Sequence, residues 1–183
     1  MSKIPKIYKH NIEITKPWSR EMYKYNQEVS YSFWLNTSSL ASLQMILSKQ
    51  ENSGNFRGQS VRLYTDGRLF FGLSNSTVNN MSVYSTSTLS INTWYHIGAV
   101  YNRADKLSLF INGIFDSSAT ISQFQANDFQ ATHIFRIGSY SDAGNSANYF
   151  LNGSISRLQI YNRVLSAQEI LQIYNATKGR YGL

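Results

Sequence analysis

Residues 29–36 read Val-Ser-Tyr-Ser-Phe-Trp-Leu-Asn, and this stretch decides the fold. Its odd positions, from Val29 to Leu35, are all apolar, and its even positions are polar except for Trp34. Strict alternation is typical of a β-strand that buries one face, because successive side chains of a strand point to opposite sides. The stretch is therefore predicted to form a core strand, with Trp34 standing on its polar face.

The same alternation recurs on both sides of this stretch. Further strands are predicted at residues 12–14, 43–48, 60–65, 68–74, 82–85, 94–102, 107–112, 114–116, 134–137 and 153–162. Two of the joints, Asp66-Gly67 and Asn112-Gly113, are dipeptides that favour the positive φ angles of a tight hairpin turn. This pattern predicts an all-β antiparallel sandwich or barrel.

One short helix is predicted near the C-terminal end. Ser166 and Glu169 have the spacing of a capping box, in which each side chain binds a backbone N–H at the start of the helix. Ile170, Ile173 and Tyr174 follow at helical spacing and form one apolar stripe. We expect this helix to dock against the sheets.

Composition excludes several classes of protein. The 183 residues include no Cys, which removes disulfides, thiolate zinc sites and a Cys nucleophile. Charged residues make up only 15%, well below the usual share of a soluble domain, and Ser, Asn and Thr provide the polarity instead. No apolar run is long enough to span a membrane, so membrane insertion is not expected.

The net charge of +7 is concentrated in part at the N-terminus. Residues 1–28 are predicted to be a basic arm, without the apolar run of a secretory signal peptide. Within it Trp18, flanked by Lys16 and Arg20, is a candidate anchor that buries into a neighbouring subunit. The other basic residues form no stripe and no nucleic-acid motif, so binding to DNA or RNA is not predicted.

Catalysis is not predicted either. Glycosidic hydrolysis needs two carboxyl groups about 5–10 Å apart, and no two of the ten Asp and Glu residues lie within four positions of each other. The three histidines lack metal-ligand spacing. His96, in a predicted strand beside Trp94, is expected to be a packed structural residue.

Five segments carry a family resemblance. They are YSFWL at residues 31–35, NTWYHIGAVY at 92–101, LSLFING at 107–113, IG at 137–138 and FLNGSISRLQIYNRVLS at 150–166. In this order they resemble the laminin-G-like, concanavalin-A-like jelly-roll family. The resemblance implies a two-sheet antiparallel jelly-roll sandwich over residues 29–183. The YNATKGRY segment at 174–181 is similar to the ends of such domains in tailed-phage structural proteins.

The resemblance bears on metal binding. Members of the family commonly carry acidic residues after a Gly-x-Ile motif, where they help to hold calcium. This chain has Ser156 and Arg157 there, and a guanidinium repels a cation. No cofactor is therefore predicted, and Asp142 with Asn145 is the best remaining oxygen cluster for a metal.

The polar loop at residues 138–148 is the predicted binding rim. Sugars are recognised by aromatic faces and by hydrogen-bonding polar groups. The candidate ligand-binding residues are Tyr140, Asp142, Asn145, Asn148 and Tyr149.

Two functions from different classes are compatible with these observations. The first is a non-enzymatic virion surface protein, a capsid decoration or fibre-like appendage. It would be anchored to other virion proteins such as a capsid or fibre base, and by analogy it would be a homo-oligomer. The second is a carbohydrate-binding lectin module of a secreted or cell-surface, extracellular protein. A virion protein can also adhere to surface glycans, so the two are not exclusive.

Overall fold

Strands with one apolar and one polar face make up most of this computed structural model, which describes residues 12–14, 28–50, 57–74, 80–121, 134–141 and 147–183. The elements are β1 (Ile12–Ile14), β2 (Val29–Thr37), β3 (Gln44–Gln50), β4 (Gly58–Leu63), β5 (Arg68–Ser74), β6 (Asn80–Thr88), β7 (Tyr95–Tyr101), β8 (Lys106–Ile111), β9 (Ile114–Thr120), β10 (Phe135–Ile137), β11 (Tyr140–Ser141), β12 (Ala147–Asn148), β13 (Gly153–Tyr161), α2 (Ala167–Thr177) and the 3₁₀ helix η2 (Lys178–Tyr181).

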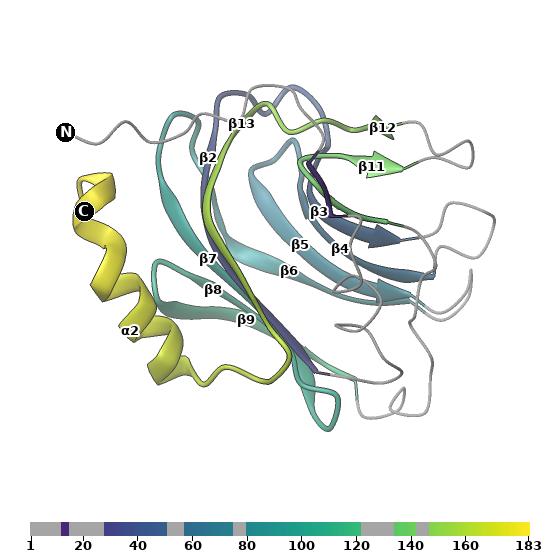
Figure 1. The fold of residues 1–183 in the computed structure, drawn as a ribbon, viewed down its shortest axis with the longest axis vertical. Coiled ribbons are helices and arrows are strands. Elements are labelled where there is room, and N and C mark those ends of the chain that lie inside the picture. The colour runs from purple at the N-terminus through teal and green to yellow at the C-terminus, as the bar shows by residue number, and fades with distance from the viewer. Residues whose placement is uncertain (1–11, 15–27, 51–56, 75–79, 122–133, 142–146) are drawn as a thin grey trace.

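Two antiparallel sheets stack as a jelly-roll sandwich, which confirms the predicted fold class (Figure 1). The six-stranded sheet has the order β1-β10-β3-β4-β5-β6, and the five-stranded sheet has the order β13-β2-β7-β8-β9. Strand β1 lies within the predicted arm, at a position where a strand was expected, and pairs with β10 at the edge of the six-stranded sheet. Strands β11 and β12 form a separate short hairpin.

The core lies between the two sheets and follows the predicted alternation. Tyr31, Phe33 and Leu35 of β2 are buried in it, facing the side chains of the six-stranded sheet such as Phe71 and Phe135. The strands differ from the prediction mainly at their ends. Strand β9 extends to Thr120, beyond its predicted end at residue 116. The sequence does not indicate this extension, because β9 is an edge strand whose polar residues give no apolar pattern.

The helix α2 lies along the outer face of the five-stranded sheet (Figure 1). Trp34 of β2 is buried on this face, beneath residues of α2 and η2. Its ring stacks on Tyr181 with a centroid distance of 3.9 Å, and its Nε1–H donates to Thr177 Oγ1 at 3.0 Å. The side chain is only 1% exposed. The aromatic residue on the polar side of β2 is thus the packing site of the C-terminal helix.

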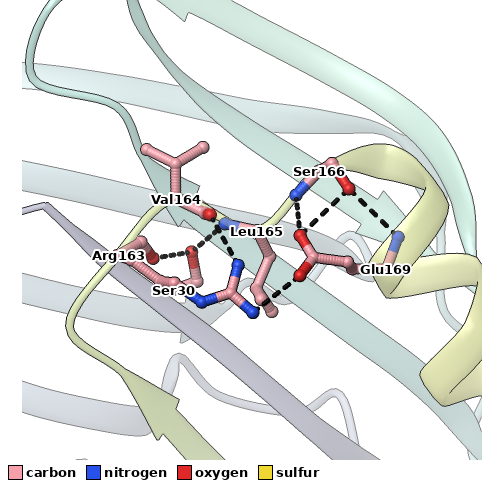
Figure 2. Close-up of polar contacts among 6 residues, drawn as sticks. All are labelled: Ser30, Arg163, Val164, Leu165, Ser166 and Glu169. Carbon is pink, nitrogen blue, oxygen red and sulfur yellow. Dashed lines mark hydrogen bonds and ion pairs between the residues drawn. The ribbon is translucent and has the colours of Figure 1, made fainter.

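The start of α2 is fixed as predicted (Figure 2). The Glu169 backbone N–H donates to Ser166 Oγ, and the Ser166 backbone N–H donates to Glu169 Oε2. Arg163 donates to Glu169 Oε1 at 2.6 Å, and these bonds, led by the one from Arg163, lower the pKa of Glu169 to about 2. Ser30, a residue of β2, holds the segment before α2 against the sheet, because its hydroxyl accepts from the Leu165 N–H.

The Asn112-Gly113 turn also packs against α2. Both residues have positive φ angles, 52° and 79°, which confirms the predicted tight hairpin. A Cβ on Gly113 would lie 3.0 Å from the Tyr174 side chain and 3.1 Å from Leu171. Glycine is needed here for the turn and for the close approach of the helix.

His96 is buried beneath the same helix, as the sequence predicts for a structural histidine. It is 0% exposed, its ring contacts those of Trp34 and Tyr174, and its Nε2 lies 2.9 Å from Ser32 Oγ. Its Nδ1 has no hydrogen-bond partner among the described residues. Burial lowers the pKa of His96 to about 4.

Asp116 joins the edge strands of the two sheets. From β9, its Oδ2 accepts from the Thr86 N–H at 2.7 Å and its Oδ1 from the Ser87 N–H at 3.0 Å, both on β6. Burial alone would raise the pKa of Asp116, but these hydrogen bonds outweigh burial and hold the pKa below its usual value. The carboxylate thereby links β9 to β6 along one edge of the sandwich.

We expect Asp116→Ala to lower the free energy of unfolding by about 2 kcal/mol, because two hydrogen bonds to a charged group are lost. The measurement is urea denaturation at pH 7. Asp105→Ala is the matched control, since within the described residues the Asp105 side chain makes only an exposed ion pair with Lys106 and should contribute little. Equal losses in the two variants would contradict the bridging role of Asp116.

Candidate functional site

A row of small side chains crosses the outer face of the six-stranded sheet. Ser48, Ser60, Gly72 and Ser82 lie opposite one another on β3, β4, β5 and β6. The residues that alternate with them, such as Val61 and Phe71, point into the core. Because the row is small and its neighbours along each strand are larger, it leaves a hollow.

This hollow is part of a cavity of ≈ 570 Å³, which we call the outer cavity. Among the described residues it is lined by Leu43, Met45, Gln50, Ser60, Arg62, Phe70, Gly72, Leu73, Ser74, Met81, Ser82, Tyr140 and Tyr149. A cavity of this size with a mixed apolar and polar lining is typical of a small-molecule or sugar site.

Gly72 makes room for the Phe70 ring in the floor of the outer cavity. A Cβ at this position would collide with the Phe70 ring, which lies directly over it. The same glycine is therefore part of the reason why the Phe70 ring can lie flat along the sheet rather than stand upright. The Phe70 ring thereby forms part of the cavity lining above Gly72.

Arg62 provides the charge in the cavity, and its guanidinium is held in place. Its Nε–H donates to Ser60 Oγ at 3.0 Å and its Nη2–H donates to Gln50 Oε1 at 2.8 Å. The guanidinium carbon lies 4.8 Å from the centroid of the Phe70 ring, a cation–π contact. Within the described part of the chain, Arg62 has no carboxylate partner.

Two of the predicted ligand-binding residues line this cavity. The rings of Tyr140 and Tyr149 are 6.1 Å apart, and Tyr140 is 5% exposed whereas Tyr149 is 51% exposed. Tyr149 has a φ of 51°, rare for a residue with a side chain, and its carbonyl accepts from the Met45 N–H at 2.8 Å. Strained backbone at a cavity marks Tyr149 as a functional candidate.

The side chains of the other predicted site residues lie outside the part of the chain that the structure describes. Asn148 pairs with Tyr140 through the backbone, but its side chain is outside the described residues. Asp142, Asn145 and the predicted anchoring residues Trp18, Lys16 and Arg20 also lie outside them. No group of three or more His, Asp or Glu that could hold a metal occurs in the ranges that the structure describes.

The departure from the family pattern at residues 156 and 157 has a structural explanation. Ser156 Oγ accepts from the Tyr181 hydroxyl at 2.9 Å, so this position holds the C-terminal 3₁₀ helix. Arg157 follows at a bulge in β13 with a φ of 52°. Ser156 therefore supports the outer face that the C-terminal helices cover.

The described carboxylates do not line the outer cavity. Asp66 and Asp105 pair with neighbouring cations in turns, Asp116 binds β6, and Glu169 caps α2. The cavity as described has groups that bind a polar ligand, but it lacks the acid pair that glycosidic hydrolysis needs.

Among the described helices, none is long and apolar enough to cross a membrane.

Comparison with known families matches residues 14–171 to the model described as the concanavalin A-like lectin/glucanases superfamily. The chain belongs to this superfamily. No curated protein matches the sequence significantly. The match covers both sheets and the first turn of α2, so it includes every strand that lines the outer cavity.

Several solved structures have a similar fold at low sequence identity. The CBM40 module of the Ruminococcus gnavus IT-sialidase, bound to α2,3-sialyllactose, has a TM-score of 0.74 and 19% identity over 91% of this chain and 96% of the module. The binding domain of botulinum neurotoxin DC, in complex with SialylT, has a TM-score of 0.66 and 17% identity over 91% of this chain and 39% of that chain. A heptameric SAP-like pentraxin from Limulus polyphemus has a TM-score of 0.62 and 16% identity over 82% of this chain and 70% of that chain.

Two of the residues predicted from the sequence, Tyr140 and Tyr149, line the outer cavity, whereas the residues of its floor were not among those predicted. Arg62, Phe70 and Gly72 were assigned to strands and given no role in binding. The available signal was the alternation within β4 and β5, which places Ser60 with Arg62 and Phe70 with Gly72 on the outward face. Which strands lie next to each other was the missing information.

Proposed function

We propose that the protein is a carbohydrate-binding module that holds acidic glycans in the outer cavity without hydrolysing them. The observation that carries this proposal is the fixed position of the Arg62 guanidinium in the cavity. Its guanidinium is fixed by Gln50, Ser60 and the Phe70 ring, and it lines a cavity without a carboxylate partner among the described residues.

The chemistry of the lining suits an acidic sugar. A guanidinium binds a carboxylate through paired N–H groups, and it loses little freedom on binding when it is already held in place. Arg62 keeps its Nη1 group free of hydrogen bonds within the described part of the chain. Hydroxyls from Ser60, Ser74 and Ser82 line the same space, and the exposed Tyr149 ring provides an aromatic edge for sugar C–H groups.

Two of the similar structures support an acidic glycan as the ligand class. The sialidase module was solved with sialyllactose and the neurotoxin domain with SialylT. The net charge of +7 also favours anionic ligands, since it raises their local concentration at the surface.

A glycan-binding module acts where glycans are displayed, so we propose an extracellular or particle-surface location. The virion role depends on the resemblance of the segment at 174–181 and on the basic arm, and it stays a prediction. The same holds for anchoring through Trp18 and for a homo-oligomeric state. The comparisons support glycan binding more directly than attachment to a particle.

The test is calorimetric titration with α2,3-sialyllactose and with neutral lactose. We expect the native protein to prefer sialyllactose. Arg62→Gln should weaken binding of sialyllactose by about 10- to 100-fold, because charge-assisted hydrogen bonds are lost, and should leave lactose binding unchanged.

Arg180→Gln is the matched control. It removes the same charge from the exposed surface of η2, on the opposite outer face, and should leave binding unchanged. Equal weakening in the two variants would indicate only a net-charge effect. Absence of any binding to sialyllactose, or full binding by Arg62→Gln, would overturn the proposal.

A further inference from the structure

Three aromatic rings form a cluster beside the outer cavity. Tyr64, Phe70 and Tyr84 have centroids 5.1–6.0 Å apart in every pair, and we call this cluster the aromatic platform. The rings of Tyr64 and Tyr84 are in edge contact, and the interaction of the two phenol groups is the largest cause that raises the pKa of Tyr84. Tyr84 is 39% exposed, so the platform is open to solvent at this ring.

The platform is continuous with the outer cavity. Phe70 belongs to both, since its ring lies over Gly72 in the cavity floor. On β6, Ser82 lines the cavity and Tyr84 follows two residues later on the same face of the sheet. Two residues of a strand span roughly 7 Å, so a ligand of two or more sugar units can reach from the cavity to the Tyr84 ring.

The charges distinguish the two ends of this surface. Arg68 lies over the Tyr84 ring at 5.2 Å, but its Nε pairs with Asp66 Oδ2 at 2.7 Å, so its charge is neutralised locally. Arg62, over Phe70, has no such partner among the described residues. An acidic group is therefore attracted to the cavity end, and a neutral group suits the platform end.

We infer that the aromatic platform of Tyr64, Phe70 and Tyr84 is a second subsite, which binds the neutral sugar that follows the acidic unit of a glycan held at Arg62. This inference rests on the proposed function and extends it. The glycan lies along the outer face of the sheet, with its acidic end in the outer cavity and the chain leading out over β6. Aromatic rings at such a place bind the C–H faces of pyranose rings.

The experiment compares two ligands that differ in length, free N-acetylneuraminic acid and 3′-sialyllactose, by calorimetric titration. We expect the native protein to bind the trisaccharide about 3- to 10-fold more tightly than the monosaccharide, the usual contribution of one aromatic contact. In Tyr84→Ala this difference should disappear, while binding of the monosaccharide stays at the native level. Tyr84→Phe keeps the ring and should keep the difference.

Phe115→Ala is the matched control, because Phe115 is a half-exposed aromatic residue on β9 of the other sheet. It should leave the affinity for both ligands unchanged. A full length difference in Tyr84→Ala would overturn the second subsite and leave the proposed function standing. Equal loss of both ligands in Tyr84→Ala would also overturn it, since the ring would then support the cavity only. A native protein that binds neither ligand would overturn the inference together with the proposed function.

Discussion

Replacing Trp34 by alanine is expected to lower the free energy of unfolding by about 4 kcal/mol, the usual range for a buried tryptophan. The side chain fills the space between β2 and the C-terminal helices, and its truncation removes the stack on Tyr181 and the hydrogen bond to Thr177. The measurement is urea denaturation of the native and variant proteins at pH 7. Because the outer cavity lies on the other sheet, the proposed binding of sialyllactose should be unchanged at low temperature.

Trp94→Ala is the control for this prediction. Trp94 also contacts Tyr181, at 5.0 Å, but it is only half-buried and should contribute about 1 kcal/mol. Hydrogen exchange adds a local readout. We expect the amides of α2 to lose protection in Trp34→Ala before those of β4 and β5. Losses of equal size in the two tryptophan variants would contradict the role given to Trp34.

Acid is expected to destabilise the protein through His96. An unfolded histidine has a pKa of about 6.5, and burial lowers the pKa of folded His96 to about 4. Between these values the unfolded chain binds a proton that the folded chain does not, so the free energy of unfolding falls as the pH falls. The loss should reach about 3 kcal/mol at pH 4.

The measurement is a series of urea denaturations from pH 7.5 to pH 4. His96→Gln removes the titrating ring but keeps a side chain that can hydrogen-bond to Ser32, so its stability should change much less with pH over this range. The comparison uses the slopes, and a lower stability of His96→Gln at pH 7 does not affect it. Parallel slopes in the two proteins would show that His96 does not cause the acid sensitivity.

Local signals in the sequence predicted the fold well where a few neighbouring residues determine the structure. The alternation of residues 29–36 placed Phe33 in the core, and Ser166 with Glu169 predicted the start of α2. The Asn112-Gly113 turn depends on backbone geometry that only these residue types favour. Each of these features is decided within one strand, one turn or one helical turn.

The site depends on contacts between distant segments, so it was predicted only in part. Tyr140 and Tyr149 could be proposed from the sequence because they flank one polar loop. The floor combines β3, β4, β5 and β6, and its shape depends on the register that sets Ser60 opposite Gly72. The partner of Trp34 could not be predicted for the same reason, since Tyr181 lies far along the chain.

The position of α2 also determines how the protein can be displayed. This helix and Leu183 lie beside the five-stranded sheet, whereas the β11–β12 hairpin is on the far side of the molecule (Figure 1). A linker attached after Leu183 therefore leaves the outer cavity facing away from any support. Several copies tethered in this way would present their cavities outward together, and weak single contacts with a glycan-coated surface would add up to strong avidity.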